Sequence, residues 1–352
     1  MKYFNIGNKV VGENQPCFFI AEAGVNHNGS IELGKKLIDA AVDAKADAVK
    51  FQTFQTEKII TRSAPKSSYH VETTGGDDKQ SWYELLKSQE MSKAMHEDLI
   101  QHCNRNNIIF LSTPYDEESV DLLFNLEIPA FKTASTDTNN IPLLKYIAKK
   151  GRPMILSTAM STMQEVEDAV SEVKKEGLRE LGVLQCTGNY PAHLKESNLL
   201  VMHEYQEKLN CVIGYSDHIS DIINPIAATA MGAKIYEKHF TLDKTLPGPD
   251  HRMSLNPIEL SKTIEAIRAT EIAMGNKKKI VLESEKENRI KLRKSITTTK
   301  AISKGELIES NMIAIKRPGN GMSPSMLGRV IGKKASVDIP SGNIVTEEML
   351  ND

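Results

Sequence analysis

The chain has 352 residues, of which 40% are apolar and 26% are charged, and its formal net charge is −2. A chain of this length and composition buries a large core and is long enough for more than one domain. Charges of both signs alternate along it, so no basic block indicates nucleic acid or an anionic membrane surface as a partner.

Location is predicted from two further features. No apolar run reaches the roughly 18 residues of a membrane span, and the first residues lack the pattern of a signal peptide. The four cysteines are widely spaced and form no CxxC pair, which favours reduced thiols. We therefore expect a cytoplasmic protein with no nucleic-acid or membrane partner.

Eight short apolar runs predict eight strands. They begin at Cys17, Asp47, Ile108, Ala130, Pro153, Gly182, Cys211 and Lys234. Most of the intervening segments are of helical length and have apolar residues at spacings of three and four. Helix caps are predicted at Ser30, Ser92 and Ser161.

This alternation of strand and helix favours a parallel sheet with helical crossovers. Eight repeats in roughly 250 residues match a closed (β/α)8 TIM barrel. An open, doubly wound sheet is the alternative. We assign the barrel to residues 1–275.

The composition and the apolar pattern of the sequence change after residue 275. Residues 276–293 are highly charged without a strong apolar stripe, which predicts a linker or an exposed helix. Residues 294–352 contain short segments punctuated by Gly and Pro, which predicts a small β-rich domain. Its size is marginal for one core, so packing against another chain would stabilise it.

Polar side chains stand at the carboxyl ends of the predicted strands. They include Glu22, Lys50, Gln52, Thr113, Lys132, Ser135, Ser157, Ser216, His218, Glu237 and His239. In a barrel these ends converge on one mouth, where barrel enzymes carry out their chemistry.

Two of these side chains suggest a metal site. His218 and His239 follow the last two strands, and neighbouring strands would bring them side by side. Two imidazoles with nearby carboxylates and open positions suit a catalytic divalent ion. The competing interpretation is that both are ordinary core histidines. A barrel fold makes this interpretation less favoured.

Two lysines suggest an anion site. Lys50 and Lys132 fall within apolar strands, where burying an unpaired ammonium is expensive. A bound anion would offset that cost, and nearby hydroxyls would complete a cradle for phosphate and carboxylate. Either lysine could instead be the Schiff-base nucleophile of an aldolase.

The stretch from Tyr236 to His251 places three ionisable residues at the end of an apolar run. Period-two alternation puts Glu237 and His239 inside the barrel, and it points Lys238 towards the helices, where it needs a carboxylate partner. The break at Pro247-Gly248-Pro249 then leads to Asp250.

Ten motifs together resemble, in order and spacing, the bacterial sialic acid synthase family. They are FIAEAGVNHNGS, AVKFQTF, FLSTPYD, FKTAS, ILSTAM, CTGNYPA, GYSDH, EKHFTLD, PGPDHRMSLNP and KRPGNGMSP. The last 60 residues resemble the antifreeze-like (SAF, β-clip) domain of that family. GPDH followed by SLNP is more similar to its neuraminate and legionaminate branch than to its pseudaminate branch.

The resemblance implies condensation of phosphoenolpyruvate with the open-chain aldehyde of an N-acylated mannosamine-type sugar. The products would be a nine-carbon 2-keto acid and phosphate. Manganese or magnesium, held by His218 and His239, would polarise the aldehyde oxygen as a Lewis acid.

The resemblance also assigns roles to individual residues. Those matching the phosphoenolpyruvate site are Lys50, Thr113, Lys132, Ser135, Ser157 and Ser216. Those matching sugar or catalytic positions are Glu22, Gln52, Asp137, Tyr190 and Asp250, with Asp137 standing where many members have Glu. Arg317 matches the arginine that reaches the sugar's N-acyl group in the partner subunit, which implies a domain-swapped homodimer.

Three alternatives to this function stay open. The same family chemistry could serve another amino sugar of a surface or spore-coat polysaccharide. A Schiff-base aldolase would use Lys132 or Lys50. A non-enzymatic carbohydrate- or ice-binding protein would explain the C-terminal domain, but it needs neither lysines nor histidines at the ends of barrel strands.

Overall fold

A computed structural model describes residues 3–76, 80–219 and 221–351. The chain divides into two compact units, residues 1–275 and residues 276–352.

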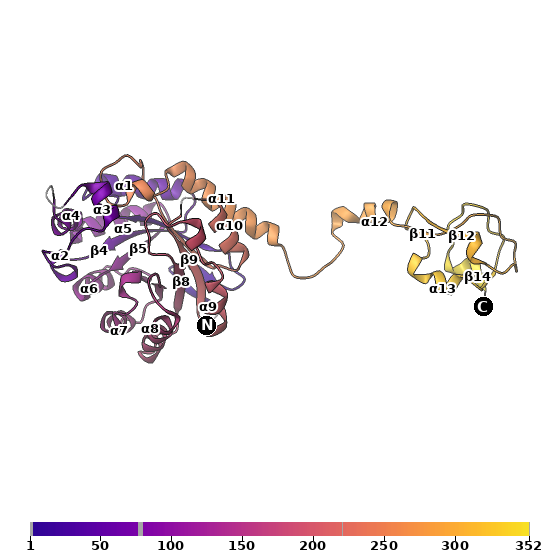
Figure 1. Cartoon of the computed structure of the whole chain (residues 1–352), viewed down its shortest axis with the longest axis horizontal. Coiled ribbons are helices and arrows are strands. Elements are labelled where there is room, and N and C mark those ends of the chain that lie inside the picture. Colours follow the sequence, from indigo (N-terminus) through magenta and orange to yellow (C-terminus); the bar gives the residue numbers. More distant parts are fainter. Residues whose placement is uncertain (1–2, 77–79, 220, 352) are drawn as a thin grey trace. The chain divides into compact units, whose positions relative to one another are not determined.

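Eight parallel strands form the centre of the first unit (Figure 1). They are β3 (Phe18–Gly24), β4 (Ala48–Thr53), β5 (Ile109–Pro114), β6 (Phe131–Thr133), β7 (Met154–Ser157), β8 (Leu181–Cys186), β9 (Val212–Asp217) and β10 (Ile235–His239). Their order is β5-β4-β3-β10-β9-β8-β7-β6, and the two end strands, β5 and β6, contact each other. The predicted eight strands and the barrel are confirmed, and the open sheet is excluded.

Helices surround the strands (Figure 1). They are α1 (Ile31–Asp43), α5 (Lys93–Arg105), α6 (Glu117–Asn125), α7 (Ile141–Ala148), α8 (Met163–Lys175), α9 (Val201–Lys208), α10 (Ile223–Ala230) and α11 (Pro257–Met274). One apolar layer fills the space between helices and strands, and a smaller one fills the barrel interior.

The predicted caps at Ser30 and Ser92 are confirmed, since each side chain accepts a backbone N–H of the first turn. The cap predicted at Ser161 is wrong by one residue. Thr162 caps α8 instead, because its side chain and that of Glu165 form a reciprocal capping box.

A short hairpin that the sequence analysis did not predict precedes the barrel. It consists of β1 (Tyr3–Ile6) and β2 (Lys9–Gly12), which pair antiparallel. Phe4, Ile6 and Val11 pack among interior residues near the strand starts, such as Ile20 and Ile155. The hairpin therefore fills the amino-terminal end of the barrel and leaves the carboxyl-terminal end for chemistry.

An insertion follows β4 before the next barrel helix. It carries three short helices, α2 (Thr56–Ile59), α3 (Ser68–Thr74) and α4 (Trp82–Gln89). Residues 77–79 within it lie outside the described part of the chain.

The second unit is small and rich in short strands. β11 (Ser295–Thr298) pairs antiparallel with β12 (Ile313–Lys316), and β13 (Lys334–Ala335) with β14 (Leu350–Asn351). Its helices are α12 (Lys286–Leu292) and α13 (Leu327–Val330), and its core contains Ile296, Ile302 and Val345.

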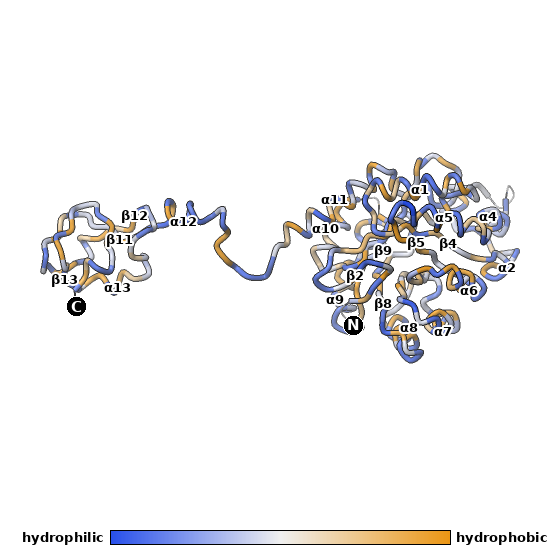
Figure 2. Tube along the Cα trace, turned by 180° about the vertical axis from the view of Figure 1, so that it is seen from behind, coloured by the Kyte–Doolittle hydropathy of each residue, from blue (hydrophilic) through white to orange (hydrophobic). Residues whose placement is uncertain are grey.

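Residues 272–294 are exposed throughout, and Figure 2 shows hydrophilic and hydrophobic stretches alternating between α11 and α12. In the part of the chain described here, no helix is both long and apolar enough to cross a membrane.

Candidate active site

A cavity of about 580 Å³ opens at the carboxyl ends of the barrel strands, and each of the eight strands contributes to its lining. Most of the predicted site residues line it. They are Glu22, Lys50, Gln52, Thr113, Lys132, Ser135, Ser157, Tyr190, Ser216, His218, His239 and Asp250. Convergence of parallel strands on one mouth therefore brings together side chains that are more than 200 residues apart in sequence.

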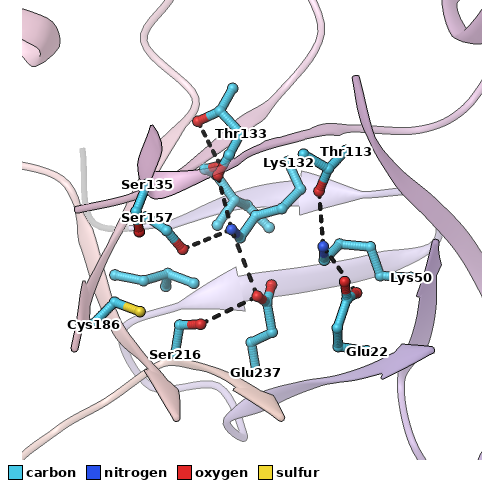
Figure 3. A network of polar contacts seen from close by, with 12 residues as sticks. Glu22, Lys50, Thr113, Lys132, Thr133, Ser135, Ser157, Cys186, Ser216 and Glu237 are labelled. Atoms are coloured by element: carbon cyan, nitrogen blue, oxygen red, sulfur yellow. Dashed lines mark hydrogen bonds and ion pairs between the residues drawn. The ribbon is translucent and has the colours of Figure 1, made fainter. Parts of the chain in front are cut away.

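Lys50 forms the first of two buried charge pairs in the cavity wall (Figure 3). Its ammonium lies 2.8 Å from Glu22 Oε2 and donates to Thr113 Oγ1 at 2.7 Å. Gln52 Nε2 donates to the other oxygen of Glu22 at 3.3 Å. The pair follows from strand register, because Glu22 and Lys50 are direct partners in the parallel ladder.

Lys132 forms the second pair. Its ammonium lies 3.6 Å from Glu237 Oε1 and donates to Ser157 Oγ at 2.6 Å. Ser216 Oγ donates to the same Glu237 oxygen at 3.2 Å, while Glu237 Oε2 is buried without a hydrogen-bond partner. Figure 3 shows Lys132 reaching between Ser157 and Glu237.

These pairs account for the burial of the two lysines. From the sequence, a bound anion was expected to offset the cost of burying Lys50 and Lys132. The protein supplies carboxylates of its own, so burial alone does not require a phosphate. The same carboxylates hold both ammonium groups at the cavity wall, where an incoming anion can reach them.

Burial also tunes the ionisable groups. It raises the pKa of Glu22 to about 7, although the Lys50 ammonium opposes the rise. Burial also raises the pKa of Asp250 to about 6, because the charged carboxylate loses its contact with water. Burial lowers the pKa of Lys132 because the desolvated ammonium is disfavoured, and Glu237 only partly compensates.

The two histidines lie side by side, with ring centroids 5.5 Å apart. His218 Nδ1 donates to the Thr187 carbonyl at 2.6 Å, so in the neutral form of the ring Nε2 is the unprotonated nitrogen. His239 Nδ1 is buried without a hydrogen-bond partner and lies 3.9 Å from Asp250 Oδ2. Tyr190 packs on His218 at a centroid distance of 4.2 Å.

This arrangement fits a divalent ion bound by two imidazoles. A ligating histidine commonly donates its other nitrogen to a carbonyl, as His218 does. Within residues 3–76, 80–219 and 221–351, no group of three or more His, Cys, Asp or Glu side chains is arranged to hold a metal ion. The remaining ligands would therefore come from water or substrate.

Two predicted residues do not line the cavity. Asp137 Oδ1 accepts from Asn140 at 2.9 Å, and its Oδ2 is buried without a hydrogen bond. Arg317 belongs to the second unit, where its exposed side chain donates to the Leu292 carbonyl at 3.0 Å.

Three polar lining residues were given no role in the predicted site: Glu237, Cys186 and Tyr115. Alternation placed Glu237 inside the barrel, but its pairing with Lys132 was not predicted, because β10 and β6 are not neighbours in the sheet. Cys186 lies with Sγ 3.7 Å from His218 Nδ1, and Tyr115 follows β5. Nothing in their local sequence distinguishes these two from ordinary core residues.

Lys238 behaves as predicted. Its ammonium lies 3.0 Å from Asp217 Oδ2, which also accepts from Tyr236 at 2.7 Å. Tyr236 packs in the layer between strands and helices, so the two faces of β10 divide as the alternation indicated.

Known proteins resemble the chain along its whole length. Residues 37–279 match the NeuB family and residues 293–351 match the SAF domain. The N,N'-diacetyllegionaminic acid synthase of Campylobacter jejuni is 42% identical over 93% of this chain and 98% of its own length. Human N-acetylneuraminate-9-phosphate synthase is 35% identical over 97% of this chain and 94% of its own length.

A solved structure agrees with these relatives. The spore coat polysaccharide biosynthesis protein SpsE of Bacillus subtilis superposes with a TM-score of 0.68 at 38% identity, covering 99% of both chains. The resemblance seen in the motifs is thereby confirmed, and the chain belongs to the NeuB family, with a barrel followed by an SAF domain.

Proposed function

We propose that this protein condenses phosphoenolpyruvate with the open-chain aldehyde of an N-acylated mannosamine-type sugar. The products are a nine-carbon 2-keto acid and phosphate. The observation that carries the proposal is one cavity lined both by two lysines with hydroxyl partners and by two imidazoles. Named synthases among the relatives support the same reaction class.

Phosphoenolpyruvate would lie against the two lysines of the cavity. Lys50 and Lys132 supply two ammonium groups for its phosphate and carboxylate, and four hydroxyls supply neutral donors. These are Thr113, Ser135, Ser157 and Ser216. Charge-assisted hydrogen bonds of this kind are short and strong, so they orient the enol carbon towards the sugar.

His218 and His239 are the residues we assign to a manganese or magnesium ion. The hydrogen bond from His218 Nδ1 to a carbonyl and the unpartnered Nδ1 of His239 support this assignment. When bound, such an ion supplies Lewis-acid polarisation of the aldehyde oxygen. Gln52, Tyr190 and Asp250 would bind the hydroxyls of the sugar from the same mouth.

The proposed condensation consumes one water molecule. C3 of phosphoenolpyruvate bonds to the aldehyde carbon, whose oxygen takes a proton. The water oxygen adds to C2, and phosphate leaves with its bridging oxygen. Glu22 is suited to accept the proton of that water, because its pKa of about 7 makes both of its protonation states accessible at neutral pH. The Asp137 side chain does not line the cavity, so we assign it no direct contact with substrate.

The two units would share the reaction. In this proposal residues 1–275 carry out the chemistry, and residues 276–293 link them to the second domain. Residues 294–352 form that domain and bring Arg317 to the N-acyl group of the sugar bound by a partner subunit. A domain-swapped homodimer follows from that role. Four cysteines without a disulfide are in keeping with a cytoplasmic location.

Phosphate release tests the proposal directly. The protein is incubated with phosphoenolpyruvate and a panel of N-acyl hexosamines, with manganese, with magnesium, or with a chelator. We expect sugar-dependent release that needs the metal. Folded protein that releases no phosphate with any sugar under any metal condition would refute the assignment.

One observation supports a second candidate. The pKa of Lys132 is lowered by burial, which favours the neutral amine that forms a Schiff base. An aldolase of this kind would act without metal, and borohydride would trap its substrate on Lys132. Metal-dependent turnover without trapping excludes it.

A further inference from the structure

A buried ion pair lies behind the two histidines, on the face of the sheet that turns towards the helices. The Lys238 ammonium lies 3.0 Å from Asp217 Oδ2, and the two side chains are only 2% and 1% exposed, so water does not screen them. Neither side chain lines the cavity in the part of the chain that the structure describes. A buried ion pair adds little net stability by itself, so its position in the fold is the more informative feature.

This pair is the last one of the ladder between β9 and β10, where Lys238 and Asp217 are direct partners. His218 directly follows Asp217 in the chain. His239 directly follows Lys238. Because successive residues of a strand point to opposite faces, the ion pair lies on the outer face and the histidines turn towards the cavity.

The same two side chains hold the backbone next to His218. Asp217 Oδ1 accepts the Ile219 N–H at 2.9 Å, and the Lys238 ammonium donates to the Ile219 carbonyl. Asn224 Nδ2, from α10, donates to Asp217 Oδ1 at 3.2 Å and fixes the carboxylate from a third element. The residues before and after His218 are therefore both tied to β10 through Lys238.

The two imidazole rings depend on this backbone for their positions. The His218 ring has one further anchor, the hydrogen bond from Nδ1 to the Thr187 carbonyl at 2.6 Å. His239 Nδ1 is buried without a hydrogen-bond partner, so the backbone of β10 and packing place that ring. Groups that stand behind metal ligands usually set the geometry of those ligands.

We propose that the Lys238–Asp217 pair is a positioning device that sets the spacing of His218 and His239 for a divalent ion. The pair itself contacts neither the ion nor the substrates. This inference rests on the proposed assignment of the ion to the two histidines. It gives a role to a buried lysine that the proposed chemistry does not use directly.

Lys238→Met tests the inference through manganese binding, measured by titration calorimetry on the full-length protein without substrate. Methionine fills much of the same space but has neither the charge nor the donors. We expect the dissociation constant for manganese to rise about ten- to a hundredfold, the range typical for loss of a residue behind metal ligands. An unchanged constant in folded Lys238→Met protein would overturn the inference.

A double variant covers the case in which Lys238→Met fails to fold because Asp217 becomes an unpaired buried charge. Asp217→Asn combined with Lys238→Met leaves a neutral pair, and the asparagine oxygen can still accept the Ile219 N–H. The donor to the Ile219 carbonyl remains missing, so manganese binding should stay weak although stability recovers. Manganese binding as tight as in the unmodified protein would contradict the positioning role.

Tyr236→Phe is the matched control in the same buried network. The Tyr236 hydroxyl donates to Asp217 Oδ2 at 2.7 Å from the outer face of β10. Phenylalanine removes this hydrogen bond and leaves Lys238 on the Ile219 carbonyl, so manganese affinity should stay close to that of the unmodified protein. A loss as large as in Lys238→Met would mean general loosening of the network and would overturn the inference.

Kinetics separate this inference from the condensation. In Lys238→Met, a roughly hundredfold higher manganese concentration should restore most of kcat, while KM for phosphoenolpyruvate should hardly change because Lys50 and Lys132 are untouched. Turnover that excess manganese does not restore would overturn the positioning role.

The unmodified protein supplies the remaining outcomes. If it binds manganese, loses affinity in Lys238→Met and turns over no sugar, the condensation is refuted and the positioning role stands. If it binds no manganese, the two-histidine assignment is refuted and this inference with it.

Discussion

Lys50 and Lys132 are each held at the cavity wall by a carboxylate of the same protein, Glu22 and Glu237. A buried ion pair adds little net stability, but removing one partner leaves an uncompensated buried charge. The pairs are therefore better understood as positioning devices. They keep two flexible ammonium groups in place before an anion arrives, which reduces the reorganisation needed at the moment of binding.

Variants of the Lys132–Glu237 pair should show separately its effect on stability and its effect on catalysis. We expect Lys132→Met to lose about 3 kcal/mol of unfolding free energy, because Glu237 is left buried without its partner. Adding Glu237→Gln should restore much of that stability, since the amide is neutral, but phosphoenolpyruvate turnover should stay low. Urea unfolding and steady-state kinetics on both variants provide the check. A double variant that recovers full activity would contradict the role of Lys132.

The histidine pair gives a second prediction. His239→Ala should abolish metal-dependent turnover and weaken manganese binding measured by titration calorimetry, because one of two protein ligands is lost. His203→Ala, at an exposed position on α9, is the control and should bind manganese normally. Unchanged metal affinity in His239→Ala would exclude the two-histidine site.

At the level of elements, the loop after β3 connects three parts of the barrel mouth. Asn26 Nδ2 donates to the Phe240 carbonyl at 2.8 Å and to Ser254 Oγ at 3.1 Å, which ties the loop to the segment after β10. Gly29 has φ of +73°, and a Cβ there would lie 2.7 Å from the Ser88 carbonyl oxygen at the end of α4. Only glycine fits that turn, so the loop can contact the insertion closely.

His27 makes this loop sensitive to pH. Burial lowers its pKa from the usual 6.5 to about 4, and its Nδ1 accepts from the Gly29 N–H at 3.0 Å. Because the unfolded chain binds the proton more readily, this contribution to stability is present above pH 6.5 and is lost as pH falls towards 4. At pH 5 the loss amounts to about 2 kcal/mol.

The matching variant is His27→Asn, which keeps an acceptor near Gly29 and removes the titrating ring. We expect its unfolding free energy to fall less between pH 7.5 and pH 5 than that of the unmodified protein. His203→Asn, at an exposed site, should retain the original pH dependence. Identical pH profiles for His27→Asn and the unmodified protein would rule out this source of acid sensitivity.

At the scale of the whole molecule, the two units have separate cores, and residues 272–294 between them are exposed. Arg317 lies in the unit without the cavity. The proposed exchange of this unit between subunits can therefore be tested by complementation.

His239→Ala and Arg317→Ala should each be impaired alone. After unfolding and refolding as a mixture, a swapped heterodimer has one cavity with an intact His239 and an intact Arg317 from the other chain. Random pairing would then restore about a quarter of the normal sites. Activity equal to the mean of the two separate variants would exclude a shared site.

Much of the barrel could be predicted from the sequence, because apolar period and turn residues are local signals. The hairpin at residues 3–12 was missed because its strands have four residues each, too few to show a period. The cap of α8 was displaced by one residue because both Ser161 and Thr162 are good caps, and only the reach of Glu165 decides between them.

For the candidate site, local sequence patterns were enough to place polar side chains at the strand ends and to identify the face of β10 that turns inward. Glu22 beside Lys50 follows from the register of two neighbouring strands. Glu237 beside Lys132 does not, because β10 and β6 are separated by three strands in the sheet and meet only across the closed barrel. The carboxylate that holds Lys132 is therefore visible only in the closed barrel, since a contact across a barrel interior has no trace in local periodicity.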